Sequence, residues 1–123
     1  MSWNSALHLR AAVASVPKGV PVVVVDNASS DGSAEVARAA GARVIEAGAN
    51  LGFGPACNLA ARDGGPSETL LFLNPDAALV DGAETLAALL AALDAEPLVA
   101  AVAPRLEGDG QELFQLRRLP SFQ

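Results

Sequence analysis

The stretch that decides the fold is residues 22–33, which read VVVVDNASSDGS: four valines run directly into a loop of Asp, Asn, Ser and Gly. A continuous run of β-branched apolar residues is typical of a strand covered on both faces, as in a parallel sheet. We predict the first strand over residues 20–25, with Pro21 at its first positions. The polar residues that follow then lie at the carboxyl end of the strand, which is where ligands bind in open α/β sheets.

Working outward from this stretch, short apolar segments alternate with Ala-rich segments of helical spacing. Further strands are predicted over residues 42–46, 69–73 and 98–102, and helices over 7–16, 34–40, 56–62 and 82–96. Gly41 and Pro97 are natural stops for two of the helices. The order predicts one α/β domain over residues 1–123, an open and mostly parallel sheet with flanking helices. Residues 113–117 could add an edge strand.

The composition limits which partners and which cellular compartment are expected. Eight basic against fourteen acidic residues give a formal charge of −6, and this balance argues against nucleic acid as a partner. No apolar run approaches the roughly 18 residues that span a bilayer, and the N-terminus lacks the form of a signal peptide. The single cysteine, Cys57, excludes an intrachain disulfide. We therefore expect a cytoplasmic domain.

Three polar loops are expected at the same edge of the sheet, and they are the main functional signal. They follow the first three predicted strands and cover residues 26–33, 50–58 and 74–77. Taken alone, the first loop is also good turn and helix-cap chemistry. The Gly-x-Gly of the second loop is a weak nucleotide signal, because the third glycine of a dinucleotide fingerprint is absent. In the third loop, Asp76 beside the amide of Asn74 suits a divalent cation that also holds a diphosphate.

Two reactive residue types are better explained as structural. His8 falls in the first predicted helix, far from the strand ends, and it is the only histidine. Cys57 therefore has no second group with which to form a nucleophile–base pair, and a structural thiol is the simpler interpretation. A serine hydrolase is also disfavoured, because no Gly-x-Ser-x-Gly occurs and His8 is the only histidine.

In order and spacing, residues 22–33, 50–58 (NLGFGPACN) and 71–77 (LFLNPDA) resemble the donor loops of family 2 glycosyltransferases. Residues 2–5 (SWNS) and 103–106 (APRL) resemble further segments of that family. The resemblance is nearest to the rhamnosyltransferase-like branch, which often carries Asn-Pro-Asp in place of Asp-x-Asp. It implies the GT-A fold and inverting transfer of a sugar from a nucleotide-diphosphate donor to an acceptor hydroxyl.

The resemblance also implies roles for the first loop. Asp26 would contact the nucleotide base, Asn27 and Ser29 would shape the base pocket, and Asp31 would support it. The donor would be deoxythymidine-diphosphate rhamnose or a uridine-diphosphate sugar, while the acceptor is left unnamed.

For the other two loops, the resemblance implies nucleoside and metal contacts. The residues placed along the nucleoside or holding its loop are Asn50, Gly52, Phe53 and Asn58. Asp76 would ligate Mg²⁺ or Mn²⁺ bridging the diphosphate, with Asn74 in the position of the first motif carboxylate. The loss of that carboxylate predicts weaker metal affinity than in Asp-x-Asp members.

Two parts of the family pattern are missing from the chain. The family's first strand would precede Ser2, and the segment with the catalytic base would lie beyond Gln123. We therefore expect a donor-binding half that is inactive alone, truncated at both ends relative to the family.

Two alternatives stay open at this point. A non-catalytic α/β association module, or a decayed glycosyltransferase fragment, could pair through unpaired strands as a homodimer. A nucleotidyltransferase of similar fold is the third interpretation, although the Gly-rich basic loop usual after its first strand is lacking.

Overall fold

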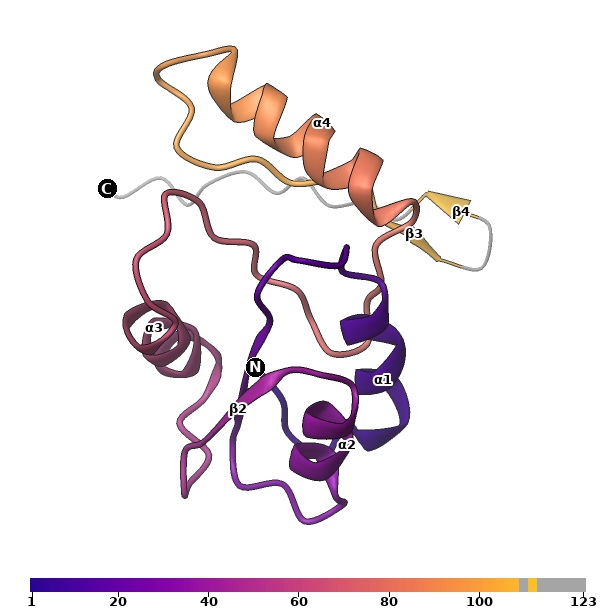
Figure 1. Ribbon diagram of the computed structural model, residues 1–123, viewed down its shortest axis with the longest axis vertical. Coiled ribbons are helices and arrows are strands. Elements are labelled where there is room, and N and C mark those ends of the chain that lie inside the picture. Colours follow the sequence, from indigo (N-terminus) through magenta and orange to yellow (C-terminus); the bar gives the residue numbers. More distant parts are fainter. Residues whose placement is uncertain (109–110, 113–123) are drawn as a thin grey trace, which may run out of the picture. The chain divides into compact units, whose positions relative to one another are not determined.

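The computed structural model describes residues 1–108 and 111–112 (Figure 1). The chain divides into two compact units, Met1–Ala83 and Glu84–Gln123. The single domain predicted over residues 1–123 stays a prediction, and each unit is described by itself. The edge strand predicted at residues 113–117 lies outside the described residues.

The first unit is built on a small parallel sheet. Strand β1 (Val23–Asp26) pairs with β2 (Arg43–Glu46) in parallel, with Val23 opposite Arg43 and Asp26 opposite Glu46. This confirms the first two predicted strands and their parallel direction. At the other edge of β1, Ser2 forms an isolated parallel bridge with Asp26.

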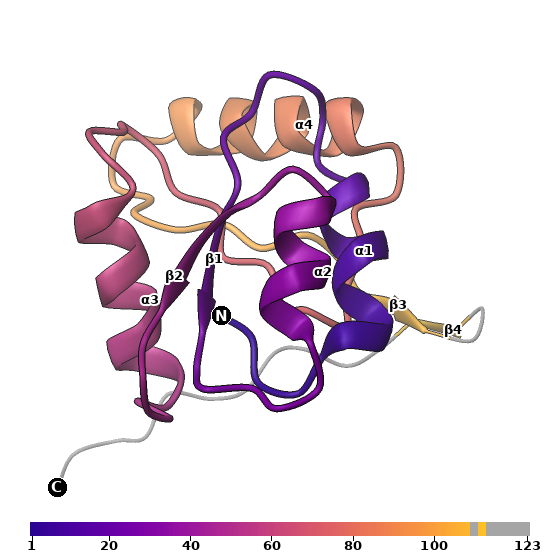
Figure 2. The ribbon, with the colours of Figure 1, turned by 60° about the horizontal axis from the view of Figure 1, so that its bottom comes forward.

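Three helices cover the two faces of this sheet. Helices α1 (Ala6–Ala14) and α2 (Ser33–Ala39) lie side by side against one face, and α3 (Phe53–Asp63) lies on the other (Figures 1 and 2). The core between the sheet and the first two helices is formed by Leu9, Val13, Val24, Ala37 and Ala42. The chain leaves α2 through Gly41, whose φ of +94° explains the glycine there.

Two predicted strands, residues 69–73 and 98–102, are wrong, because neither segment forms a strand. Leu70, Leu71 and Phe72 are 50%, 42% and 56% exposed, and a cavity separates this segment from β1. A strand exists only where a neighbour accepts its ladder of hydrogen bonds. The same holds for residues 98–102, where Leu98 is exposed and no described strand runs alongside.

The second unit contains most of one helix and a short hairpin. Helix α4 (Gly82–Asp94) starts at the end of the first unit and ends before Pro97, two residues short of its predicted end. Strands β3 (Glu107–Gly108) and β4 (Gln111–Glu112) pair antiparallel, and the sequence did not predict them. Within the described part of the chain, every helix is too short or too polar to cross a bilayer.

Candidate functional site

Asp26, the last residue of β1, organises the first loop. Its side chain is almost completely buried, and both of its carboxylate oxygens accept from Ser29. The Ser29 backbone N–H donates to Oδ2 at 2.9 Å, and the Ser29 hydroxyl donates to Oδ1 at 2.6 Å. Ala28, between them, has a φ of +59°, a left-handed conformation rare for alanine. The carboxylate therefore holds a tight turn, while each oxygen keeps a second lone pair for a ligand.

The N-terminal segment forms a second wall of this loop. The Asn4 N–H donates to the Ser29 hydroxyl oxygen at 2.9 Å, and the Ser30 N–H donates to Asn4 Oδ1 at 2.9 Å. Residue-type reasoning gave Asn4 no role. The only signal for it was the resemblance of the SWNS stretch at residues 2–5 to a further segment of the family, and that resemblance assigned Asn4 no contact.

Asp31 joins the beginnings of two helices. Its Oδ2 accepts from the Ala6 N–H at 2.9 Å and its Oδ1 from the Ser33 N–H at 3.0 Å, and the Ser33 hydroxyl also donates to Oδ1. The Ser33 hydroxyl in turn accepts from the Ser5 N–H at 2.8 Å. The Ser33 side-chain hydrogen bond, followed by that of the Ala6 backbone, lowers the pKa of Asp31. Asp31 is thus a shared cap for α1 and α2.

Asn27 connects the first loop to the second. Its side chain is fully buried; Nδ2 donates to the Gly52 carbonyl at 3.4 Å, and Oδ1 accepts from the Leu51 N–H at 3.4 Å. The second loop is further closed by the Gly52 N–H, which donates to Asn50 Oδ1 at 3.0 Å. Gly52 has a φ of +79°, so a side chain there would be strained. The structure therefore brings the two loops together, as the strand order predicted.

Helix α3 begins directly behind the second loop, at Phe53, three residues earlier than predicted. Phe53 is 55% exposed, and Asn58 also lies on the exposed part of the helix. The helix is anchored instead through Ala56, which is completely buried. An exposed aromatic ring next to the Asn27–Gly52 connection offers a face for stacking.

The third loop is separate in its bonding. The Ala77 N–H donates to the Asn74 carbonyl at 3.1 Å, forming a turn that leaves the side chains of Asn74 and Asp76 exposed. No hydrogen bond joins these two side chains to another described residue. In the part of the chain that the structure describes, no three His, Cys, Asp or Glu side chains gather as a metal site.

One buried polar atom near the first loop has no hydrogen-bond partner. Ser2 is 0% exposed, and its hydroxyl bonds to nothing in the structure, although its backbone is fully engaged. The Ser2 N–H donates to the Val25 carbonyl at 2.7 Å, and its carbonyl accepts from the Asn27 N–H at 2.8 Å. The Ser2 backbone thus fixes the N-terminal segment beside Asp26.

Comparison with known proteins agrees with this arrangement. The sequence model described as glycosyl transferase family 2 matches residues 2–121, nearly the whole chain. No match was found among curated proteins or among solved structures. The matched range includes the three polar loops, the N-terminal segment that contacts the first loop, and both strands of the parallel sheet. The chain therefore belongs to glycosyl transferase family 2.

Proposed function

We propose that this chain binds the nucleoside diphosphate of a sugar donor with its first two loops, for inverting transfer of the sugar to an acceptor hydroxyl. The observation that carries the proposal is the connection made by buried Asn27, which fixes one loop against the other at the ends of β1 and β2. A surface already held in shape by its own hydrogen bonds needs little ordering when a ligand arrives.

The first loop suits a pyrimidine base. Thymine and uracil both present an imide N–H, and the remaining lone pairs of the Asp26 carboxylate can accept from it. Ser29 holds that carboxylate in one orientation. The exposed ring of Phe53 supplies a stacking surface at the start of α3. This chemistry fits deoxythymidine and uridine diphosphates alike, and the Asn-Pro-Asp of residues 74–76 favours the rhamnosyl donor through its branch resemblance.

The third loop fits a metal that arrives with the diphosphate. Mg²⁺ is usually bound through one or two carboxylates together with substrate phosphates, so a single free carboxylate is enough. Asp76 is such a group, exposed and hydrogen-bonded to no described residue, with the Asn74 amide oxygen two positions away. The metal, Mg²⁺ or Mn²⁺, would neutralise charge on the departing diphosphate. Asp76 and Asn74 would hold it beside the diphosphate of the donor.

We assign no catalytic base to the described residues. The two carboxylates of the first loop already serve the fold, since Asp26 holds the turn at Ser29 and Asp31 caps two helices. A base must be free to take the acceptor's proton within hydrogen-bond reach. We therefore infer that the 123 residues bind the donor without transferring its sugar when they act alone.

Calorimetric titration of the purified chain with deoxythymidine diphosphate and uridine diphosphate, with and without Mn²⁺, tests this proposal. We expect binding that Mn²⁺ strengthens, and Asp76→Ala should abolish the metal-dependent part. Asp94→Ala is the matched control, because Asp94 is an exposed carboxylate at the end of α4 and should leave binding unchanged. Absence of binding by folded protein would overturn the donor site, and sugar transfer by the chain alone would overturn its inactivity.

A further inference from the structure

Asn4 holds the first loop, residues 26–33, at two neighbouring positions. Its backbone N–H donates to the Ser29 hydroxyl oxygen at 2.9 Å, and its side-chain Oδ1 accepts from the Ser30 N–H at 2.9 Å. Ser5 and Ala6, which follow it, donate to the same loop with their backbone N–H groups. Asn4 thus combines a backbone donor with a side-chain acceptor, so its residue type contributes to the shape of the loop.

The hydrogen bonds continue from Asn4 through Ser29 to the carboxylate of Asp26. The Ser29 hydroxyl accepts from the Asn4 N–H and donates its own proton to Asp26 Oδ1 at 2.6 Å. The Ser29 N–H donates to the other carboxylate oxygen, Oδ2, at 2.9 Å. Both carboxylate oxygens are thus bonded to one residue, and Asn4 fixes that residue directly and through its neighbour Ser30. The position of Ser29 therefore determines the orientation of the Asp26 carboxylate.

The residue type at position 4 is explained by these bonds and by the backbone rather than by packing. Asn4 is exposed, and its φ of +48° lies in the left-handed region, where Asn and Asp are more frequent than other residues with a side chain. Alanine there would lose the Oδ1 acceptor and strain the backbone. Glycine would lose the acceptor alone, whereas aspartate would keep both the acceptor and the tolerated φ. The three substitutions therefore separate the hydrogen bond from the backbone conformation.

We propose that Asn4 is a positioning residue for the donor base: by fixing Ser29, it holds the Asp26 carboxylate in the orientation that accepts the imide N–H of uracil or thymine. The inference rests on the proposed function, in which Asp26 makes that contact. A turned carboxylate would meet the imide N–H at a poorer angle, and hydrogen bonds weaken steeply as the angle worsens. Asn4 should therefore affect the choice between bases with and without the imide proton more than it affects affinity in general.

The test compares uridine diphosphate with N3-methyluridine diphosphate, in which a methyl group replaces the imide proton. Calorimetry with Mn²⁺ present gives the ratio of the two affinities for each variant. In the parent chain uridine diphosphate should bind at least about 10-fold tighter, which is the contribution of one hydrogen bond to a charged group. Asn4→Ala and Asn4→Gly should each lower this ratio about 5-fold, and Asn4→Asp should keep it. The added charge of the aspartate repels both diphosphates equally, so it cancels in the ratio.

Asp81→Ala is the matched control for backbone strain. Asp81 is exposed like Asn4, and its φ of +47° is nearly the same. It lies away from the first loop, because the next residue, Gly82, comes close to the Ser15 carbonyl at the C-terminal end of α1. Asp81→Ala should therefore leave the affinity ratio at the parent value.

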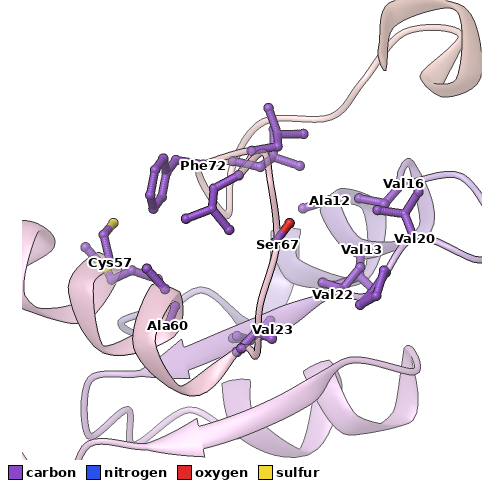
Figure 3. A pocket seen from close by; sticks show the side chains of 18 of the residues that line it. Ala12, Val13, Val16, Val20, Val22, Val23, Cys57, Ala60, Ser67 and Phe72 are labelled. Atoms are coloured by element: carbon purple, nitrogen blue, oxygen red, sulfur yellow. The ribbon is translucent and has the colours of Figure 1, made fainter. Parts of the chain in front are cut away.

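Two further readouts need no nucleotide. Amide hydrogen exchange of the Ser29 N–H, which donates to Asp26, should accelerate several-fold in Asn4→Ala and Asn4→Gly but not in Asn4→Asp. The Cys57 thiol lines the cavity shown in Figure 3, and no residue of the range 26–33 is among the described lining residues. Its alkylation rate should stay the same in every variant, which shows that the rest of the unit is folded. Asn4→Gly keeps the test decisive if Asn4→Ala does not fold.

The outcomes separate this inference from the proposed function. If the parent chain binds uridine diphosphate and its methyl derivative equally, or binds neither, the imide contact of the proposed function is wrong and the role of Asn4 fails with it. If the parent discriminates but Asn4→Gly keeps the ratio within about 2-fold of the parent value, Asn4 does not position Asp26, while donor binding stands. A lowered ratio that Asn4→Asp shares equally would also refute the role of the side-chain acceptor.

Discussion

Replacing Asn27 by alanine should loosen the connection between the two loops by an amount that the structure allows us to work out. Two hydrogen bonds of 3.4 Å are lost, and bonds of this length lie at the low end of the usual range, about 0.5 kcal/mol each. Removing a fully buried amide adds the cost of a small cavity, roughly 1 kcal/mol more. The Leu51 N–H and the Gly52 carbonyl, which lose their partner, lie in an exposed loop, so water can replace the lost hydrogen bonds. The total is about 2 kcal/mol.

Thermal unfolding followed by circular dichroism measures this change. For a unit of this size, about 2 kcal/mol corresponds to a fall in Tm of roughly 10 °C. Amide exchange at Leu51 should accelerate in parallel, because its N–H donates to Asn27. Asn58→Ala is the control: Asn58 is exposed and bonds to no described residue, so its Tm should barely change. If Asn27→Ala lowered the Tm no more than the control does, the connection would not hold the loops.

Three further predictions concern single positions. Hydrogen bonds lower the pKa of Asp31 in the folded chain, so its carboxylate stabilises the fold at pH values above its usual pKa of 3.8. This stabilisation is lost as the pH falls through the lower pKa of the folded state. The Tm of Asp31→Asn should therefore depend less on pH below about 4 than the Tm of the parent chain does. Ser2→Ala removes a buried hydroxyl without a partner, and urea unfolding should show a gain of about 1 kcal/mol, whereas a loss would mean that the hydroxyl is bonded in solution. Gly41→Ala, at a φ of +94°, should cost about 1 kcal/mol in the same assay, while Gly54→Ala, in helix α3 without positive φ or a close neighbour, should be neutral or stabilising.

The parts of the fold that the sequence predicts well are those decided by local pattern. The valine run before Asp26 and the segment at residues 42–46 form strands within three residues of the expected limits. All four predicted helices exist, and helices α2 and α4 end shortly before Gly41 and Pro97, whose backbone preferences do not continue a helix. In each case the local structure is determined by residues only a few positions apart: a continuous apolar run, a helical spacing of apolar residues, or a single glycine or proline.

The third predicted strand shows where such reasoning stops. Residues 69–73 carry the apolar pattern of a buried strand, but strand formation depends on a neighbour that pattern alone cannot supply. In the structure this segment borders a cavity instead of a ladder. The shared cap at Asp31 is unpredictable for a related reason. Its partner Ser33 is two residues away in the sequence, but Ala6 becomes a neighbour only after α1 and α2 have packed together.

The polar residues of the three loops divide according to burial, and this division bears on how a donor would bind. In the first two loops the buried side chains of Asp26 and Asn27 are already hydrogen-bonded, so a ligand meets a surface that is largely ordered. In the third loop, Asn74 and Asp76 are exposed and bond to no other described side chain. Base and nucleoside contacts then require little reorganisation, whereas diphosphate and metal contacts must order the exposed side chains of Asn74 and Asp76. Affinity for the nucleoside should consequently depend on the preformed loops, and the metal-dependent part of the affinity on how readily the Asp76 side chain is fixed.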